Sequence, residues 1–147
     1  MRTGILIMLL TGLLSAAQVL PIRNKLVLKE CGSCHFAYQP GLLPSHSWKK
    51  IMHNLANHFG VDASLDKKDN AKIAKYYAKN ASDKSRSYLS RMITKYTRAN
   101  EIRITTGSVF RSAHREVSRR YFKRKSGGAG NCMACHRTAS MGYYNEE

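Results

Sequence analysis

The sequence has few acidic residues and, beyond its first 20 positions, no apolar run long enough to cross a bilayer. Only 9 Asp and Glu stand against 25 Lys and Arg among 147 residues, which gives a formal net charge of +16. This balance excludes an acidic solvating protein and favours an anionic partner. Hydrophobic residues make up 43% and charged residues 23%, so the chain is neither a disordered tail nor a polytopic membrane protein.

The first residues have the pattern of a secretory signal peptide. Met1-Arg2 is a short basic start, residues 4–14 are almost wholly apolar, and Ser15-Ala16-Ala17 supplies the small residues that a signal peptidase reads. An uncleaved anchor is the alternative, because the apolar stretch 4–20 reaches the lower limit for a membrane span. The small-residue site favours cleavage. We therefore expect residues 1–17 to be removed and the mature protein to be exported to the periplasm, which weakens a nucleic-acid interpretation of the charge.

The apolar pattern beyond the signal peptide is helical, because no long stretch alternates with a period of two. The sequence therefore predicts an all-α fold. We expect four helices: one capped by Ser45 or Ser47 and ended by Gly60, one over 66–81, a short one within 83–100, and one from Thr106 or Ser108 through Tyr121. A boundary within the polar stretch 83–100 predicts two helical units, at 18–82 and 83–147.

The four cysteines form two Cys-x-x-Cys-His motifs, at 31–35 and 132–136. This pattern is the attachment signature for c-type haem. Two thiols three positions apart can each form a thioether with one haem vinyl group, and the adjacent histidine projects its imidazole at the iron. We expect two covalently bound haem c groups, held by Cys31, Cys34, Cys132 and Cys135, with His35 and His136 as proximal ligands.

Other interpretations of the cysteines are weaker. A zinc site built from two Cys-x-x-Cys pairs usually separates them by about 15–20 residues, far fewer than lie between Cys34 and Cys132. A thioredoxin-like site needs a βαβ context, which the sequence does not show. Two disulfides in such short loops would leave the two adjacent histidines unexplained.

Each iron needs a second axial ligand, and four histidines remain for this role. On a helix beginning near Ser45, His58 lies at the edge of the apolar face, whereas His46 and His53 face water. His114 similarly lies at the edge of the apolar stripe of its helix. We therefore expect His58 and His114 to be the distal ligands. A core histidine bonded to backbone remains the alternative for each.

Methionine is the rival class of distal ligand. Met52 fits the apolar stripe of its helix and is better explained as core, Met92 is available, and Met141 lies too close to His136 to reach the opposite haem face. The sequence does not decide which haem each distal histidine serves. Proximity in the chain assigns His58 to the first and His114 to the second.

Two bis-histidine irons would be saturated and of low potential, because a methionine ligand raises the potential. Saturated irons do not bind substrate, so this ligation favours an electron carrier without enzymatic activity. A haem enzyme, such as a peroxidase or a nitrogen-oxide reductase, is the alternative and needs one open iron. A haem-based sensor is a third, although such proteins normally carry an output domain.

Beyond these motifs the sequence resembles the small exported dihaem cytochromes c over most of the mature chain. The shared positions are Leu43-Pro44, Ser47-Trp48, Ile51-Met52, Leu55, His58-Phe59-Gly60, Asp62-Ala63-Ser64-Leu65, Asn80-Ala81, Arg103-Ile104-Thr105, Phe110, His114 and Gly142-Tyr143. The resemblance implies two haem-bearing helical units, the first similar to a small cytochrome c domain, with distal ligands at His58 and His114. It also implies electron transfer from a membrane cytochrome b to a small oxygen-binding monohaem cytochrome.

Two basic segments indicate where a partner could bind. Residues 115–125 carry six cations and one acid, and a second face carries Lys67, Lys68, Lys72, Lys75 and Lys79. A solvated helix exterior explains such runs equally well. As a docking surface, either would steer an acidic redox protein, such as another cytochrome. An anionic membrane surface is the second candidate, and nucleic acid is third because export removes its usual target, so we expect no nucleic-acid partner.

Overall fold

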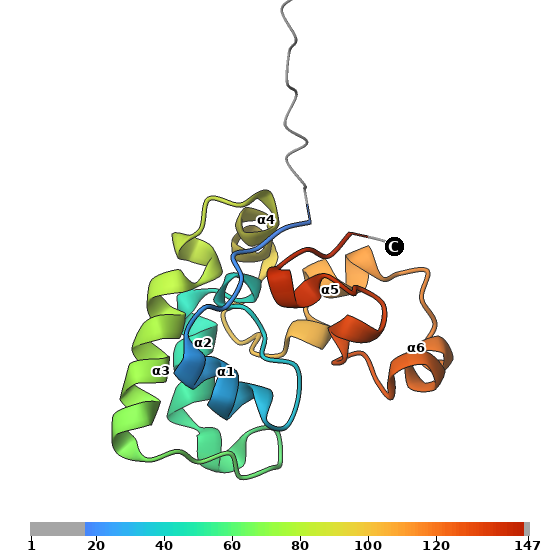
Figure 1. The fold of residues 1–147 in the computed structure, drawn as a ribbon. Coiled ribbons are helices and arrows are strands. Elements are labelled where there is room, and N and C mark those ends of the chain that lie inside the picture. The colour runs from blue at the N-terminus through green and yellow to red at the C-terminus, as the bar shows by residue number, and fades with distance from the viewer. Residues whose placement is uncertain (1–16, 146–147) are drawn as a thin grey trace, which may run out of the picture.

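The computed structural model describes residues 17–145, and its regular structure there is helical (Figure 1). Six α-helices follow one another as α1 (Lys25–Gly32), α2 (Ser45–His53), α3 (Lys67–Asn80), α4 (Tyr88–Tyr96), α5 (Ser108–Ala113) and α6 (Arg119–Ser126). Short 3₁₀ turns and two isolated β-bridges complete the described part. The prediction of an all-α fold is confirmed. All but one of the residues of the predicted signal peptide lie outside the described range, and no helix within that range is long and apolar enough to span a membrane.

The main core forms where α2 packs against α3. Trp48 and Tyr77 face each other across this contact with their ring centres 4.2 Å apart, and the Trp48 indole donates a 2.7 Å hydrogen bond to the Pro40 carbonyl. Burying each large apolar side chain stabilises the fold by about 1.5–3 kcal/mol. The buried members of this cluster are Ile22, Val27, Leu43, Trp48, Ile51, Met52, Ile73, Tyr77 and Ala81.

A carboxylate from a distant turn caps α2. The N-cap position is Pro44, whose side chain offers no acceptor. Asp83 takes over this function: one carboxylate oxygen accepts from the Ser45 backbone N–H at 2.7 Å, and the other accepts from the Ser45 hydroxyl at 2.8 Å. The turn after α3 is thereby fixed to the start of α2.

A second cluster connects the N-terminal segment with α4 through buried Val19, Leu42 and Ile93. Side-chain hydroxyls add hydrogen bonds here: the Ser90 hydroxyl donates to the Gly41 carbonyl at 3.1 Å, and the Thr94 hydroxyl donates to the Ser82 hydroxyl at 2.8 Å. Helix α4 therefore packs on residues that precede it in the chain. The predicted boundary between the units 18–82 and 83–147 stays a prediction. This second cluster contains residues from both sides of that boundary.

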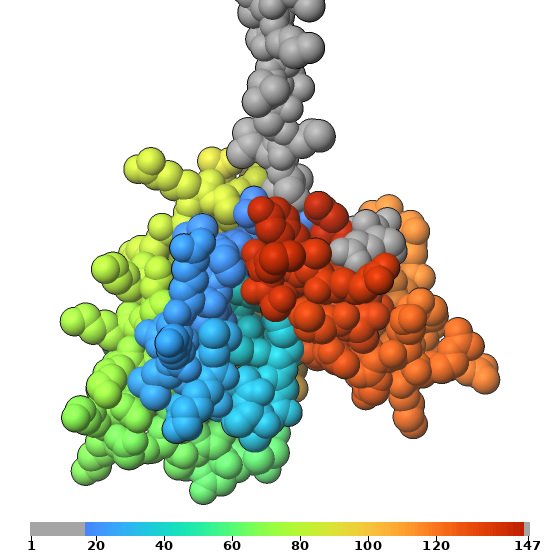
Figure 2. Space-filling view, in the orientation of Figure 1, coloured from blue at the N-terminus to red at the C-terminus, as the bar shows by residue number. Residues whose placement is uncertain are grey.

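The two ends of the described chain pair with each other. Val19 donates its N–H to the Gly142 carbonyl at 2.9 Å, and Tyr144 donates its N–H to the Ala17 carbonyl at 2.8 Å. Figures 1 and 2 show the C-terminal segment in red lying against the N-terminal segment in blue. Gly142 adopts φ 86°, and a Cβ there would collide with the Val19 carbonyl, so this position needs glycine.

Two predicted helices are shorter than expected. Helix α2 ends at His53 instead of continuing to Gly60, because Asn54 leaves the helical region and the chain turns through a 3₁₀ segment at Leu55–Asn57. The helix predicted through Tyr121 is divided into α5 and α6, since the Ser118 side chain accepts from the Tyr121 N–H and starts a new helix. Helix α1, capped by the Asn24 side chain, was not predicted.

Candidate functional site

The first Cys-x-x-Cys-His motif lies at the end of α1. Cys31 occupies the last turn of that helix and is half-buried, whereas Cys34 and His35 follow it and are exposed. His35 places its Nδ1 2.7 Å from the Phe36 carbonyl. Because a carbonyl can only accept, Nδ1 carries the proton in this bond and Nε2 is left as a free lone pair.

A tight turn after α2 presents His58. Its backbone N–H donates to the Val61 carbonyl at 2.8 Å, and the Val61 N–H donates to the His58 carbonyl at 3.2 Å. Phe59 at φ 55° and Gly60 at φ 97° close this turn in the left-handed region. The sequence predicted that His58 is presented from a helix, which is wrong, although the half-buried position of the ring agrees with the predicted edge of the core.

The rings of His35 and His58 lie parallel to each other. Their centres are 6.1 Å apart and their planes differ by 11°. Burial lowers the pKa of His58, and the nearby His35 ring and the Arg103 guanidinium lower it further. Arg103 itself lies over the Phe59 ring, with its guanidinium carbon 4.1 Å from the ring centre. The described structure thus favours neutral imidazole at His58, which is the form that binds a metal.

The second motif wraps into a single turn at Cys132–Ala134. The His136 N–H donates to the Cys132 carbonyl at 2.8 Å, so cysteine and histidine lie on one side of the turn. Its imidazole Nδ1 lies 3.1 Å from the Asn145 carbonyl, which again leaves Nε2 as a free lone pair. Burial raises the pKa of the Cys132 thiol to about 11, and burial also raises the pKa of Cys31.

His114 lies at the break between α5 and α6. Its Nδ1 is 2.9 Å from the Phe110 carbonyl, one turn earlier in α5. Phe110 stacks on the His114 ring with centres 4.1 Å apart, and Phe122 of α6 lies 5.7 Å away. The His114 ring centre is 5.9 Å from that of His136, with the planes at 77°. The chain therefore brings each predicted distal histidine to the proximal histidine nearest to it in sequence.

Both histidine pairs fit an iron held between two imidazoles. An imidazole nitrogen bonds a transition metal at about 2 Å and the ring centre lies about 1 Å behind it, so opposed rings have centres about 6 Å apart. The two spacings match this value. In His35, His114 and His136 the Nδ1 bond to a carbonyl sets the tautomer and orientation that a metal-ligating histidine usually has. None of the four cysteines forms a disulfide, so each sulfur is available for a thioether bond.

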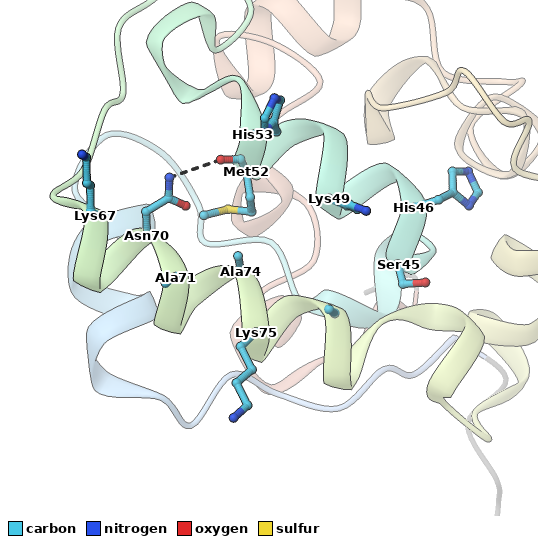
Figure 3. A pocket seen from close by; sticks show the side chains of 11 residues that line it. Ser45, His46, Lys49, Met52, His53, Lys67, Asn70, Ala71, Ala74 and Lys75 are labelled. Atoms are coloured by element: carbon cyan, nitrogen blue, oxygen red, sulfur yellow. Dashed lines mark hydrogen bonds between the residues drawn. The ribbon is translucent and has the colours of Figure 1, made fainter.

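The remaining candidate ligands lie elsewhere. His46 and His53 are exposed, as predicted, and line a hollow between α2 and α3 that contains none of the motif residues (Figure 3). Met52 belongs to the main core, as predicted, and its carbonyl accepts from the Asn70 side chain. Met92, the remaining rival, is half-buried on α4.

Tyr38 connects the two motifs, and sequence reasoning missed it. Its ring centre is 5.4 Å from that of His35, and its hydroxyl donates a 2.7 Å bond to the Gly130 carbonyl, two residues before Cys132. Burial is the largest of the effects that raise the pKa of Tyr38 to about 12. The next residue, Gln39, donates to the Ala139 carbonyl at 2.5 Å and accepts from the Tyr144 hydroxyl. Nothing in the sequence marked this loop as more than a connection.

Comparisons with known proteins agree with this geometry. The family model described as dihaem cytochrome c matches residues 27–144. A dihaem cytochrome purified from Rhodobacter sphaeroides is 36% identical, with 84% of this chain and 99% of that chain covered and a TM-score of 0.70. A second structure of a dihaem cytochrome c from the same organism is 34% identical over 85% of this chain and 99% of that chain, with a TM-score of 0.73.

A third solved structure is a dihaem cytochrome c from Shewanella baltica OS155. It is 34% identical, with 83% of this chain and 87% of that chain covered and a TM-score of 0.67. The curated proteins contain no match. With two attachment motifs, two facing histidine pairs and a family model that spans nearly all of residues 17–145, the chain belongs to the dihaem cytochrome c family and is a haem electron-transfer protein with two covalently bound haem c groups.

Proposed function

We propose that this cytochrome is a periplasmic electron carrier with two bis-histidine irons. Cys31 and Cys34 hold the first haem, and Cys132 and Cys135 hold the second. His35 and His58 are the axial ligands of the first iron; His114 and His136 are those of the second. The observation that carries this proposal is the presence of two neighbouring imidazole pairs, His35–His58 and His114–His136, with ring centres 6.1 and 5.9 Å apart.

The bound haem supplies an iron that changes between the ferric and ferrous states. The residues of the chain hold the axial imidazoles in the tautomer and position that the iron needs. The carbonyls of Phe36, Phe110 and Asn145 hold three of the imidazoles in the tautomer whose Nε2 is free. The tight turn at His58–Val61 holds the fourth. Ligands fixed before the electron arrives need little rearrangement when the charge on the iron changes, which suits rapid transfer.

Two filled axial positions leave no site for substrate at either iron, so electron transfer is supported over the alternative of a peroxidase or nitrogen-oxide reductase. We further propose that the carrier receives electrons from a membrane cytochrome b and delivers them to a small oxygen-binding monohaem cytochrome. The resemblance to small exported dihaem cytochromes c supports this placement. The predicted signal peptide at 1–17 supports the periplasmic location.

Carbon monoxide binding to histidine variants tests the ligation. We expect His58→Gly and His114→Gly each to open one iron, so that each reduced variant binds one equivalent of carbon monoxide. The matched controls His46→Gln and His53→Gln remove exposed histidines and should bind none. A wild-type protein that already binds carbon monoxide, or variants that do not, would favour methionine ligation or an enzymatic site.

The assignment of each distal histidine to its haem is tested in a variant that carries only one haem. With Cys132 and Cys135 both changed to Ala, the first haem alone remains. In that background His58→Gly should open the remaining iron and His114→Gly should leave it closed. The opposite pattern would reverse the assignment while leaving the electron-carrier function intact.

A further inference from the structure

Helix α6 presents a surface of unopposed positive charge. Its eight residues contain five cations, all exposed, and no acid: Arg119, Arg120, Lys123, Arg124 and Lys125. None of the four ion pairs found among residues 17–145 involves this helix. Arg119 faces Lys123 and Arg120 faces Arg124 at a spacing of four, and such like-charged pairs destabilise a helix by about 0.2–0.5 kcal/mol each. An acidic partner would relieve this repulsion.

The position of α6 places this charge beside the second histidine pair. Figure 1 shows the helix at the periphery of the molecule, and in Figure 2 the orange segment that contains it extends outward. Its aromatic inward side chain is Phe122, which is half-buried and has its ring centre 6.0 Å from that of Phe110 and 5.7 Å from that of His114. Only α6 itself and its Phe122 side chain therefore lie between a protein bound on the outer face of this helix and the proposed iron ligand His114.

The lysine-rich face of α3 differs in its charge balance and in the residues that its helix contacts. Acidic side chains accompany its lysines, because Asp66 caps the helix and Asp69 pairs with Lys72 at 2.8 Å. Its inward side chains, Ile73 and Tyr77, belong to the main core, and Tyr77 reaches the first attachment motif through hydrogen bonds with the Tyr38 carbonyl at 3.1 Å and with the Cys31 side chain. No ring contact within the described residues joins α3 to any of the four ligand histidines. Of the two basic segments in the sequence, α6 alone combines uncompensated charge with contact to a ligand.

We propose that α6 is the docking surface through which an acidic redox protein approaches the His114–His136 side of this cytochrome. The inference rests on the proposed electron-carrier function and names the surface at which its partner binds. The five cations raise the association rate by steering the acidic protein, so binding weakens as salt rises. The second haem is then the one that exchanges electrons with this partner.

An anionic membrane fits α6 less well. A helix that lies in a membrane surface presents an apolar face to the lipid, opposite its basic face. In α6 the phenylalanine points into the protein, and Tyr121, at 42% exposure, is the one large apolar residue on the helix with substantial exposure. The outer face thus offers charge with little apolar area to insert.

The test compares two charge-matched variants of the haem-loaded protein. One changes Arg119, Arg120, Lys123, Arg124 and Lys125 to Gln, and the control changes Lys67, Lys68, Lys72, Lys75 and Lys79 to Gln, so each loses five positive charges. Oxidised flavodoxin, an acidic redox protein, serves as the probe, and its association is followed at increasing ionic strength. Vesicles of phosphatidylcholine with and without phosphatidylglycerol serve as the membrane probe.

We expect the α6 variant to lose about 10-fold or more in association rate at low salt and most of its salt dependence, while the α3 variant stays within about threefold of wild type. Equal losses in both variants would show that only net charge matters and would overturn the proposal. So would loss of vesicle binding by the α6 variant with flavodoxin binding unchanged. A potentiometric titration checks the proposed function separately: irons that do not cycle reversibly would refute electron carriage even if flavodoxin still docks on α6.

Discussion

The Tyr38 hydroxyl donates a hydrogen bond to the Gly130 carbonyl at 2.7 Å, across 92 positions of the chain. The Tyr38 ring also lies 5.4 Å from that of His35, and Gly130 precedes the cysteine that begins the second attachment motif. One side chain thus contacts the first haem-binding motif and fixes the loop that leads into the second. Together with the bond from Gln39 to the Ala139 carbonyl, this connection joins the two sites.

Removing that hydroxyl should loosen the loop without disturbing the first motif. We expect Tyr38→Phe to lower the free energy of unfolding by about 1 kcal/mol, because the Gly130 carbonyl loses its donor. Amide hydrogen exchange should increase at residues 128–132. The control Tyr88→Phe removes a hydroxyl from a side chain that is 54% exposed and should change neither quantity. Equal stability of the two variants would mean that the bond does not hold the sites together.

Gly142 should tolerate no side chain. Its φ of 86° and the nearby Val19 carbonyl together predict that Gly142→Ala lowers the free energy of unfolding by about 2–3 kcal/mol. Gly127 is the matched control, because it has φ 72° and a Cβ added there would meet no neighbouring atom. Gly127→Ala should therefore cost only about 1 kcal/mol. Thermal unfolding of both variants measures the difference, which should vanish if the chain ends do not pair.

Asp83 should make stability depend on acid pH. Burial alone would raise the pKa of this carboxyl, but the hydrogen bonds from Ser45 and the contact with Lys84 outweigh it and hold the pKa below its ordinary value. A carboxyl with a lowered folded pKa stabilises the fold above its unfolded pKa, near 4, and this contribution is lost as pH falls through the folded value. Asp83→Asn should cost about 1 kcal/mol at neutral pH and less below about pH 3.

The comparison of wild type and Asp83→Asn must span that acid range. Urea unfolding at several pH values gives the difference in free energy directly. A constant difference between neutral and acid pH would show that the carboxylate charge does not stabilise the start of α2. Glu116→Gln, at a side chain that is 85% exposed, is the control and should have little effect at any pH.

Each attachment motif should hold one haem independently. Changing Cys132 and Cys135 to Ala should leave a protein whose mass is lower by one haem, and changing Cys31 and Cys34 should give the same loss. Intact-protein mass spectrometry after denaturation measures covalent haem alone. A variant that retained both haems, or lost both, would contradict separate attachment at the two motifs.

The attachment motifs, and the helices in the regions that became α3 and α4, could be predicted from local patterns. Asp66 marks the start of α3, and the spacing of Ile73 and Tyr77 marks its buried face. The ends of α2 and of the helix after Thr106 could not be predicted by the same rule. Apolar residues such as Leu55 and Phe59 continue the helical spacing. Asn54 nevertheless leaves the helical region, and the Ser118 side chain accepts from the Tyr121 N–H and starts a new helix.

The prediction of the iron ligands from local sequence patterns was limited in the same way. Helical geometry selected His58 and His114 over His46 and His53, and the structure places both selected residues next to a motif histidine. The helices α2 and α5 end before His58 and His114, so helical geometry alone does not select these residues, and the need of each iron for a second ligand selects them as well. Contacts between residues distant in sequence leave no periodic pattern that could be used to predict them. The contacts of Tyr38, Asp83 and Phe122 are of this kind.

The most direct test of the bis-histidine account is the absorption spectrum of the haem-loaded wild-type protein, oxidised and reduced, with and without carbon monoxide. The account predicts low-spin bands at both irons, no change on addition of the gas, and no near-infrared charge-transfer band from methionine to iron. High-spin features, a carbon monoxide shift or a methionine band would contradict it, because any of these means that at least one iron is not held between two imidazoles.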